Sequence, residues 1–472
     1  MQLVAAVTLT RFLLPADYGL AALATLCSGM TGYFTQLGVN RSIVQKPGLT
    51  KDNIRAAFTL GTMTGAIGYA ALYLLAPILV RYFREPRLLH VIDVFGLSLI
   101  FQAIGMVASG LLRREFRMRD LALCDLFAYL LSTFGIGLPM AISGYGVWAL
   151  VGSNASQPLI AAIAYFIARP HSVFPTFRRA HYAGIVGFST RASITTTVEA
   201  ISGNLDMIVM GRVISPVGIG IYNRCATLSF QPCYNLSMGI VRVFHPTAAR
   251  AAEKGRNAPL ETLVAYERLS MSLMIPLCAM TALIAPTLIP AVFGAQWKSA
   301  VPIYRIMCLV SLLDASFHLP AMQLEVFGRF RYKIILQACF AVCLGVGIIV
   351  FGPKGGIIAV GIVYAVLQAV RSVGLHFLSA QSLGTATPIL MKSWLPGVVC
   401  AIITCGVLYP LHQLTANFQG TAAGLAKTAG LMLVAAAVAA FVYRQFYRTI
   451  VYRELASLFG TRQHSEAAAV AD

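Results

Sequence analysis

The sequence predicts an all-α integral membrane protein with about 14 transmembrane helices, the first of them truncated. Of its 472 residues, 58% are hydrophobic and only 11% are charged, and the mean hydropathy is +0.75. Soluble domains carry roughly 25% charged residues. Apolar runs of about 20 residues, the length that crosses a bilayer as a helix, recur along the whole chain. An internal repeat predicts that the helices form two related halves.

The repeat is carried by short motifs that recur in the same order. The spacing R-x3-P-x3-G occurs in RFLLPADYG at 11–19 and returns in RVISPVGIG at 212–220. Two further pairs follow at a similar offset: LAP at 75–77 with IAP at 284–286, and FRMR at 116–119 plus GVWA at 146–149 with FRYK at 330–333 plus GIIA at 356–359. Three ordered matches indicate a duplicated unit of about 205 residues, which is a domain copy rather than a solenoid repeat.

The first half, residues 1–168, begins with an apolar run up to Leu14 that is too short to span a bilayer. We therefore expect the true start to lie upstream of Met1, or the chain to be a fragment. A turn at 15–17, a basic loop at 46–51, a proline-containing break at 84–87 and an arginine-rich cluster at 113–119 separate the apolar runs that follow. The predicted helices are 18–43, 54–82, 88–112, 121–142 and 147–168.

A cytoplasmic linker at 169–181, which contains two prolines and several basic residues, is the expected boundary before the second half at 182–380. That half repeats the scheme with helices at 182–213, 218–244, 260–293, 301–326, 334–351 and 357–380. An additional helix pair, 389–411 and 422–443, occupies the segment 381–443. The tail at 444–472 is expected to be cytoplasmic, with a basic amphipathic stretch suited to the membrane surface.

The positions of Lys and Arg predict how the helices are oriented. Loops after even-numbered helices collect most of these residues, whereas SGYG at 143–146 and SPVG at 215–218 carry none; the loop at 84–87 departs from this bias. Positive loops favour the cytoplasm, so we expect both termini there. Because each half has an even number of helices, the two halves enter the membrane in the same sense, which is a transporter-like architecture.

Composition also excludes several classes of function. The net charge of +19 is explained by cytoplasmic loops and does not require a nucleic-acid partner. The ten cysteines lie almost all in apolar runs without a C-x2-C pair, so we expect neither a metal site nor a cofactor. No loop is long enough for the soluble domain that a sugar-transferring enzyme usually has, and no catalytic motif is present. The sequence therefore predicts a protein that is not an enzyme and has no catalytic residues.

Charged residues inside the predicted helices are the candidates for function, because a charge costs about 2.5–3.5 kcal/mol in the bilayer and usually faces a cavity. Arginine has a fixed charge and bidentate geometry that suit an anionic head group, and amides can bind sugar hydroxyls. The candidate substrate-binding residues are Arg191, Arg242, Arg371, Arg224, Asn204 and Gln231. Intramembrane ion pairing and helix–helix hydrogen bonding are the competing interpretations.

Three carboxylates, Asp206, Glu199 and Asp314, are candidates for coupling transport to an ion. Glu199 and Asp206 are seven residues apart and therefore share one face of a helix. For Arg212, Arg305 and Glu325, which lie near predicted helix ends, a structural role is favoured.

Several stretches resemble polysaccharide transporters of the Wzx/PST type, which belong to the multidrug/oligosaccharidyl-lipid/polysaccharide exporter superfamily, and most closely the colanic-acid and exopolysaccharide branch. These stretches are RFLLPADYGLAALAT at 11–25, IVQK at 43–46, LLRREFRMRDLAL at 111–123, NLDMIVMGRVISPVGIGIYNRCATL at 204–228, RVFHP at 242–246 and FGAQWKSAVPIYRIM at 293–307. Their order and spacing carry the resemblance. The chain departs from the family at Gln36-Leu37-Gly38, where an acidic residue often precedes Leu-Gly.

The resemblance implies a flippase of the bacterial inner membrane that moves undecaprenyl-diphosphate-linked oligosaccharide repeat units from the cytoplasmic to the periplasmic leaflet by alternating access. Besides this substrate and membrane lipid, the implied partners are the polysaccharide polymerase and co-polymerase. Arg191, Arg242 and Arg371 are then the expected ligands of the diphosphate. The alternative is a small-molecule antiporter of the multidrug type, although such a protein should favour carboxylates over this excess of arginine.

Overall fold

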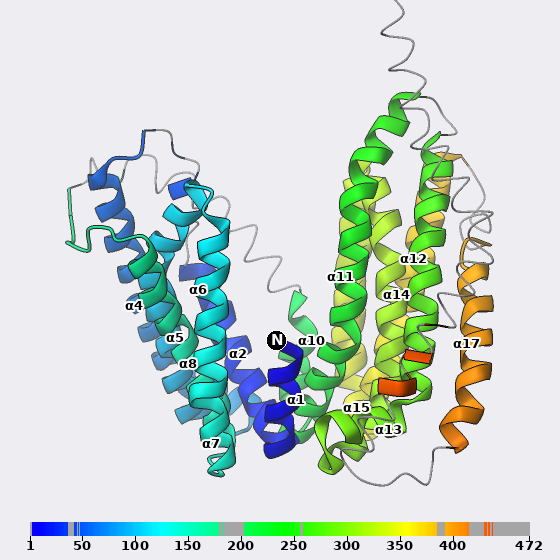
Figure 1. Ribbon diagram of the computed structural model, residues 1–472, viewed down its shortest axis with the longest axis horizontal. Coiled ribbons are helices and arrows are strands. Elements are labelled where there is room, and N and C mark those ends of the chain that lie inside the picture. The colour runs from blue at the N-terminus through cyan, green and yellow to red at the C-terminus, as the bar shows by residue number, and fades with distance from the viewer. Residues whose placement is uncertain are drawn as a thin grey trace, which may run out of the picture. The chain divides into compact units, whose positions relative to one another are not determined.

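The computed structural model describes residues 2–35, 42–44, 46, 48–178, 182, 203–254, 258–384, 392–414, 429–431, 433–434 and 437. These residues form helices joined by turns and short loops, and the described part contains no strand (Figure 1). Within it, eight helices are long and apolar enough to cross a membrane. The predicted all-α integral membrane fold is confirmed, and the total of about 14 helices stays a prediction.

The chain divides by its internal contacts into two compact units. The first contains residues 1–223 and 348–353, and the second contains 224–347 and 354–472. The predicted domains, with a linker at 169–181, follow the sequence repeat rather than packing, and they stay a prediction because 183–202 lies outside the described residues. The same holds for the tail at 444–472.

The first unit is built around α5, which packs against α2, α4, α6 and α8. Its elements are α1 (Gln2–Phe12), α2 (Pro15–Thr35), α4 (Lys51–Phe83), α5 (Leu88–Arg114), α6 (Met118–Leu130), a π-helical segment (Leu131–Gly137), α7 (Leu138–Ile142), α8 (Val147–Ala168) and α10 (Leu205–Val213), together with the start of α11 (Pro216–Lys254). α4 begins at a capping box, in which Thr50 and Asn53 each bond the other's backbone N–H. The predicted helix 121–142 is thus observed as α6, the π-helical segment and α7 in sequence.

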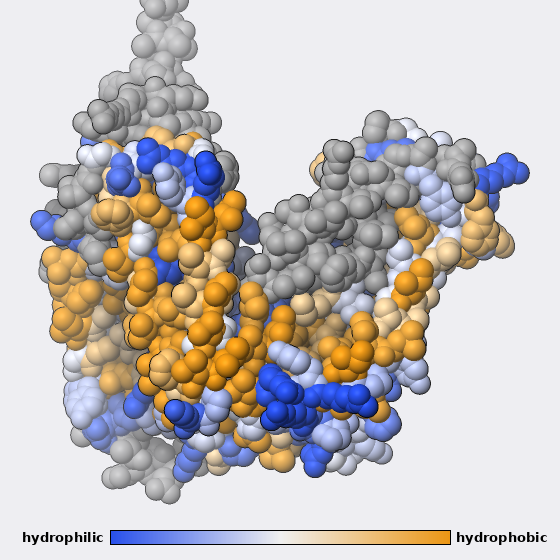
Figure 2. Space-filling model, turned by 180° about the vertical axis from the view of Figure 1, so that it is seen from behind, coloured by the Kyte–Doolittle hydropathy of each residue, from blue (hydrophilic) through white to orange (hydrophobic). Residues whose placement is uncertain are grey.

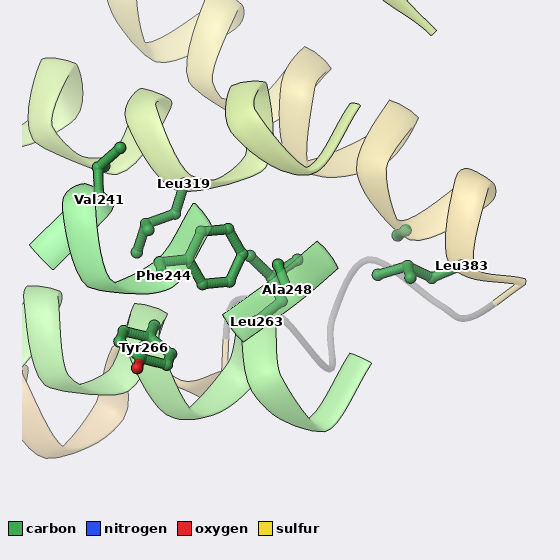
Figure 3. Close-up of a cluster of buried hydrophobic side chains, with 8 residues drawn as sticks. Val241, Phe244, Ala248, Leu263, Tyr266, Leu319 and Leu383 are labelled. Atoms are coloured by element: carbon green, nitrogen blue, oxygen red, sulfur yellow. The ribbon is translucent and has the colours of Figure 1, made fainter. Parts of the chain in front are cut away.

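The second unit contains most of α11 and the helices that follow it, apart from residues 348–353. These are α12 (Ala258–Leu283), α13 (Ala285–Phe293), a 3₁₀ segment (Ala295–Ala300), α14 (Val301–Val326), α15 (Phe330–Leu383) and α17 (Leu395–Leu414). α12 packs against both α14 and α17. Figure 3 shows a buried apolar cluster in which Val241 and Phe244 of α11 meet Leu263 and Tyr266 of α12 and Leu319 of α14.

The helix predicted at 260–293 is interrupted at Ile284. Pro286 lacks the N–H that would bond the carbonyl of Ala282, and its ring disfavours a continuous helix there. The side chain of Arg305 donates to that carbonyl from 3.1 Å, so the bond that proline removes is replaced. The break and its arginine therefore form one structural feature.

The sequence repeat is accompanied by repeated backbone geometry. Gly146 (φ 56°, ψ −128°) and Gly356 (φ 59°, ψ −151°) share a conformation that is open essentially only to glycine. At Gly356 this conformation kinks the 54-residue α15 between the two helices predicted there. The turns at 112–117 and 324–329 also match. Both have the same pattern of N–H to carbonyl hydrogen bonds, and both contain a residue with a left-handed backbone, Phe116 in the first and Gly328 in the second. The backbone therefore aligns Phe116 with Gly328, whereas the sequence motifs FRMR and FRYK align Phe116 with Phe330.

Much of the apolar surface is exposed. Large side chains such as Leu74, Val342 and Ile402 are 73%, 64% and 66% exposed. In Figure 2 hydrophobic side chains cover broad areas of the face shown, and hydrophilic ones gather toward the ends of the helices. A soluble protein rarely leaves such large apolar areas in water, so these surfaces are the lipid-facing sides of the helices.

Candidate functional site

The structure describes seven of the nine predicted site residues. Arg191 and Glu199 lie outside the described residues. Asn204 and Asp206 belong to the first unit, and the others belong to the second: Arg224, Gln231, Arg242, Asp314 and Arg371.

Three of the predicted substrate-binding residues lie on one face of α11. At 100° per residue, Arg224, Gln231, Asn235 and Arg242 fall within about 40° of one another around the helix axis. They span about 27 Å along it, close to the thickness of the hydrocarbon core. Gln231 and Arg242 are exposed, Arg224 is partly exposed, and the amide of Gln231 donates to Asn235 from 3.1 Å. We call these four residues the α11 polar stripe.

The remaining pair, Arg371 and Asp314, forms a buried ion pair between α15 and α14. Arg371 Nη2 lies 2.8 Å from Asp314 Oδ1, and the exposed fractions of the two side chains are 7% and 22%. Gln368 donates to the same carboxylate oxygen from 3.0 Å, and His318 lies 3.5 Å from the other. The sequence assigned Arg371 to the substrate and Asp314 to an ion, but the structure brings them together.

Two aromatic rings hold the Arg371 guanidinium in place. Its central carbon lies 4.1 Å from the ring centre of Phe317 and 4.3 Å from that of Phe340, within the range of cation–π attraction. Its Nη1 also donates to Gln337 from 2.8 Å. The guanidinium is thus held by two aromatic rings and by a hydrogen bond at its tip, as a preorganised anion ligand would be.

The acidic end of this group faces toward α11. The ring of His318 lies 6.0 Å from that of Tyr234, which is 49% exposed and stands on α11 between Gln231 and Asn235 in sequence. The Asp314–Arg371 pair is therefore connected to the helix that carries the polar stripe through one histidine and one tyrosine.

In the first unit, Asp206 lies in the first turn of α10 and accepts a hydrogen bond from the Tyr222 hydroxyl at 2.9 Å. Asn204 is the residue that precedes this helix, and its side chain does not cap it. These contacts tie α10 to the start of α11.

The residues for which a structural role was favoured have local partners. Arg212 donates to the carbonyls of Arg81 and Tyr82 at the end of α4, where a cation also complements the helix dipole. Arg305 bonds Ala282, as described above, and Glu325 pairs with Lys333.

Sequence reasoning missed a second buried ionisable pair, between Glu267 of α12 and His376 of α15. His376 Nε2 lies 3.2 Å from Glu267 Oε1, and the side chains are 2% and 1% exposed, respectively. The indole N–H of Trp394, just before α17, donates to the same oxygen from 3.0 Å. The signal that would have found this pair is the presence of Glu267 and His376 inside apolar helices, since such residues are rare and usually functional.

The two copies of the R-x3-P-x3-G motif pack directly on each other. Pro15 begins α2, Pro216 begins α11, and the helices cross where Gly19 and Gly220 follow these prolines. A methyl group on Gly19 would lie 1.8 Å from the carbonyl oxygen of Pro216, and one on Gly220 would lie 1.8 Å from that of Pro15. The contact is therefore reciprocal, and only glycine fits on either side of it.

Acidic and sulfur-containing side chains can also bind metal ions. In the part of the chain that the structure describes, no group of three or more His, Cys, Asp or Glu side chains could hold a metal ion.

Comparisons with known proteins find similarity to proteins of polysaccharide biosynthesis. A family described as "Polysaccharide biosynthesis protein" matches residues 8–302. The teichuronic acid biosynthesis protein TuaB of Bacillus subtilis (strain 168) is 22% identical over 382 residues, covering 79% of this chain and 78% of that protein. The lipopolysaccharide biosynthesis protein WzxC of Escherichia coli (strain K12) is 22% identical over 412 residues, covering 84% and 81%.

Among solved structures, the lipid II flippase MurJ in an inward closed conformation superposes with a TM-score of 0.70. The sequences are 13% identical, and the match covers 94% of this chain and 96% of that one. At this identity the match shows that the two proteins share a fold.

Proposed function

The chain belongs to the polysaccharide biosynthesis protein family, and from this premise we propose that it is a flippase for lipid-linked oligosaccharides. It moves repeat units carried on undecaprenyl diphosphate from the cytoplasmic to the periplasmic leaflet of the bacterial inner membrane. Both termini lie in the cytoplasm, as the loop charges favour. The work is transport without covalent chemistry, and the polymerase and co-polymerase that use the repeat unit are its partners.

The observation that carries this proposal is the α11 polar stripe. An arginine facing lipid costs about 2.5–3.5 kcal/mol, so a stripe with two arginines and two amides is expected to face water or a polar ligand. Arginines at both ends suit phosphate oxygens, and the amides between them suit sugar hydroxyls. A stripe about as long as the hydrocarbon core is thick gives a charged head group polar contacts at several depths.

The Asp314–Arg371 pair is the proposed second ligand for the diphosphate. A diphosphate that approached Arg371 would compete with Asp314 for its N–H groups, because both are bidentate acceptors. Asp314, once displaced, would be a buried carboxylate without its cation, and proton uptake would remove that charge. Substrate binding and protonation would thus be linked at one pair, with Arg371 and Asp314 keeping the separate roles that the sequence assigned to them.

The driving force can come from the membrane potential alone. A diphosphate carries about two negative charges, and a potential of about 100 mV supplies roughly 2.3 kcal/mol per charge. Outward movement of the head group would therefore release about 4–5 kcal/mol. Exchange of a proton would add to this force or replace it.

The test is to measure lipid intermediates in the native host. The gene is replaced by the Arg242→Gln variant or by Arg331→Gln, an exposed arginine near the start of α15 that lies outside the stripe. Undecaprenyl-linked intermediates are identified by mass spectrometry, and their sidedness is determined with an impermeant probe. We expect R242Q, at normal protein levels, to accumulate the complete repeat unit on the cytoplasmic face. We expect R331Q to leave the lipid intermediates unchanged.

Three outcomes contradict the proposal. An incomplete repeat unit in cells that lack the protein would point to an enzyme. Unchanged lipids together with a drug-sensitivity phenotype would point to a small-molecule antiporter. Normal export in R242Q would remove Arg242 from the binding site.

A further inference from the structure

The buried pair of Glu267 and His376 has an unusual arrangement of hydrogen atoms. His376 Nδ1 lies 2.8 Å from the backbone carbonyl oxygen of Ser372. A carbonyl oxygen can only accept, so Nδ1 must carry the hydrogen of this bond. The other ring nitrogen, Nε2, then faces Glu267 Oε1 at 3.2 Å.

That second contact requires one more proton. Without it, the lone pair of Nε2 and a negatively charged carboxylate oxygen would face each other inside the protein. With it, the pair is either imidazolium and carboxylate or imidazole and carboxylic acid, and both forms are neutral overall. Loss of the proton would leave one uncompensated charge on side chains that are at most 2% exposed, which costs several kcal/mol.

The surroundings supply little to stabilise that charge. Trp394 donates its indole N–H to Oε1 from 3.0 Å, while Glu267 Oε2 is buried without a hydrogen-bond partner. Other charged or titratable groups on the helices packed around the pair include Glu261, Tyr266 and Arg268 on α12, Asp314 and His318 on α14, Arg371 on α15, Arg242 on α11, Lys392 just before α17 and Cys400 on α17.

The pair is also connected to the Asp314–Arg371 group. Ser372, whose carbonyl binds His376, directly follows Arg371, and its hydroxyl lies 2.6 Å from that of Ser316, two residues after Asp314. A shift of Arg371 toward an anionic ligand would therefore be felt at His376 through one turn of α15.

We propose that Glu267 and His376 form a proton-binding site that exchanges one proton during the transport cycle. The ligand is a proton shared between the carboxylate and the imidazole. Its role in transport rests on the proposed flippase function, whereas its existence does not. Trp394 reports on it, because its indole is bonded to the carboxylate and its ring lies 5.6 Å from that of His376.

The test uses the fluorescence of the purified full-length protein in detergent as a function of pH. The chain has three tryptophans, so the emission of a Trp394→Phe variant is subtracted to isolate the signal of Trp394. We expect a one-proton transition in the wild-type difference signal. Glu267→Gln should abolish it, and His376→Gln should move it by about one pH unit or more, a tenfold change in proton affinity. Glu261→Gln, an exposed change on the same helix, is the control.

The pH-dependent transition also distinguishes a proton site from a purely structural hydrogen bond. If the contact were only structural, removing it would lower the melting temperature, but the fluorescence of Trp394 would show no pH-dependent transition. A transition that is absent in the wild type, or that keeps its midpoint in H376Q, overturns the site. These two results decide the question even if E267Q does not fold, and neither of them contradicts the flippase proposal.

The role in transport is tested by the lipid measurement described above. We expect E267Q to accumulate the complete repeat unit at normal protein levels, while E261Q exports normally. Normal export by a folded E267Q would overturn the coupling and would leave the proton site as a local feature.

Discussion

Alanine at Gly19 or Gly220 should force apart the helices that begin the two sequence repeats. The new methyl group would lie 1.8 Å from a proline carbonyl oxygen in either case, whereas real Cβ contacts essentially never fall below 3.0 Å. The crossing must therefore open by at least about 1.2 Å, which is the difference between these two distances. The obstacle is backbone, so no side-chain rotation can relieve it. Overpacking of this kind costs about 1–3 kcal/mol.

The same two helices provide matched controls. A methyl group on Gly29 of α2 or on Gly239 of α11 would meet nothing within 4 Å. At these positions alanine should be neutral or should stabilise the helix by about 0.5–1 kcal/mol, because glycine is a poor helix former. The predicted effects thus have opposite signs on one helix, and a general effect of replacing glycine cannot produce them.

The assay is thermal unfolding of the purified protein, followed by fluorescence. G19A and G220A should melt several degrees below G29A and G239A. The double variant G19A/G220A should lose less than the sum of the single losses, because one opening of the crossing accommodates both methyl groups. Equal melting temperatures for crossing and control variants, or strictly additive losses, would refute the close approach of the two motifs.

Three further predictions concern other parts of the chain. Asp314→Asn should cost about 3–5 kcal/mol by leaving Arg371 buried without a counter-charge, and the double variant D314L/R371M should recover most of that loss in denaturant unfolding. Burial beside Phe58 and Phe166 lowers the pKa of His171 in the segment after α8 below its ordinary 6.5. The folded state then binds fewer protons than the unfolded state, so stability should fall as pH drops below about 6.5, and less so in His171→Phe, as melting curves between pH 5 and 8 would show. Gly397→Ala should weaken the docking of α17, since its methyl group would lie 2.6 Å from the Met271 carbonyl, whereas Gly406→Ala should be tolerated in the same melting assay.

The helices could be predicted from sequence because hydropathy and length determine them. Residues 147–168 and 301–326 are helical with the predicted bounds. The break at Ile284 was missed although Pro286 signals it, because the apolar run continues through it. Hydropathy alone therefore predicts one continuous helix, whereas the proline breaks the helix at the backbone.

The polar stripe could be partly predicted, because residues on one helix are related by a fixed angle. The two ion pairs could not. Asp314 and Arg371 are separated by 57 residues, and Glu267 and His376 by 109. Their meeting depends on which helices pack together and on how each is rotated. Sequence reasoning therefore named Arg371 and Asp314 individually but gave them unrelated tasks.

The crossing and the stripe lie on the same helix, and this connects the repeat to the proposed function. Gly220 and Arg224 are one turn apart on α11, so the residue that fixes the crossing is followed at once by the first cation of the stripe. The loops beside the crossing carry almost no charge, which places it at the periplasmic end in the proposed topology. A head group that travelled along the stripe from Arg242 toward Arg224 would move toward the end of α11 that carries Gly220.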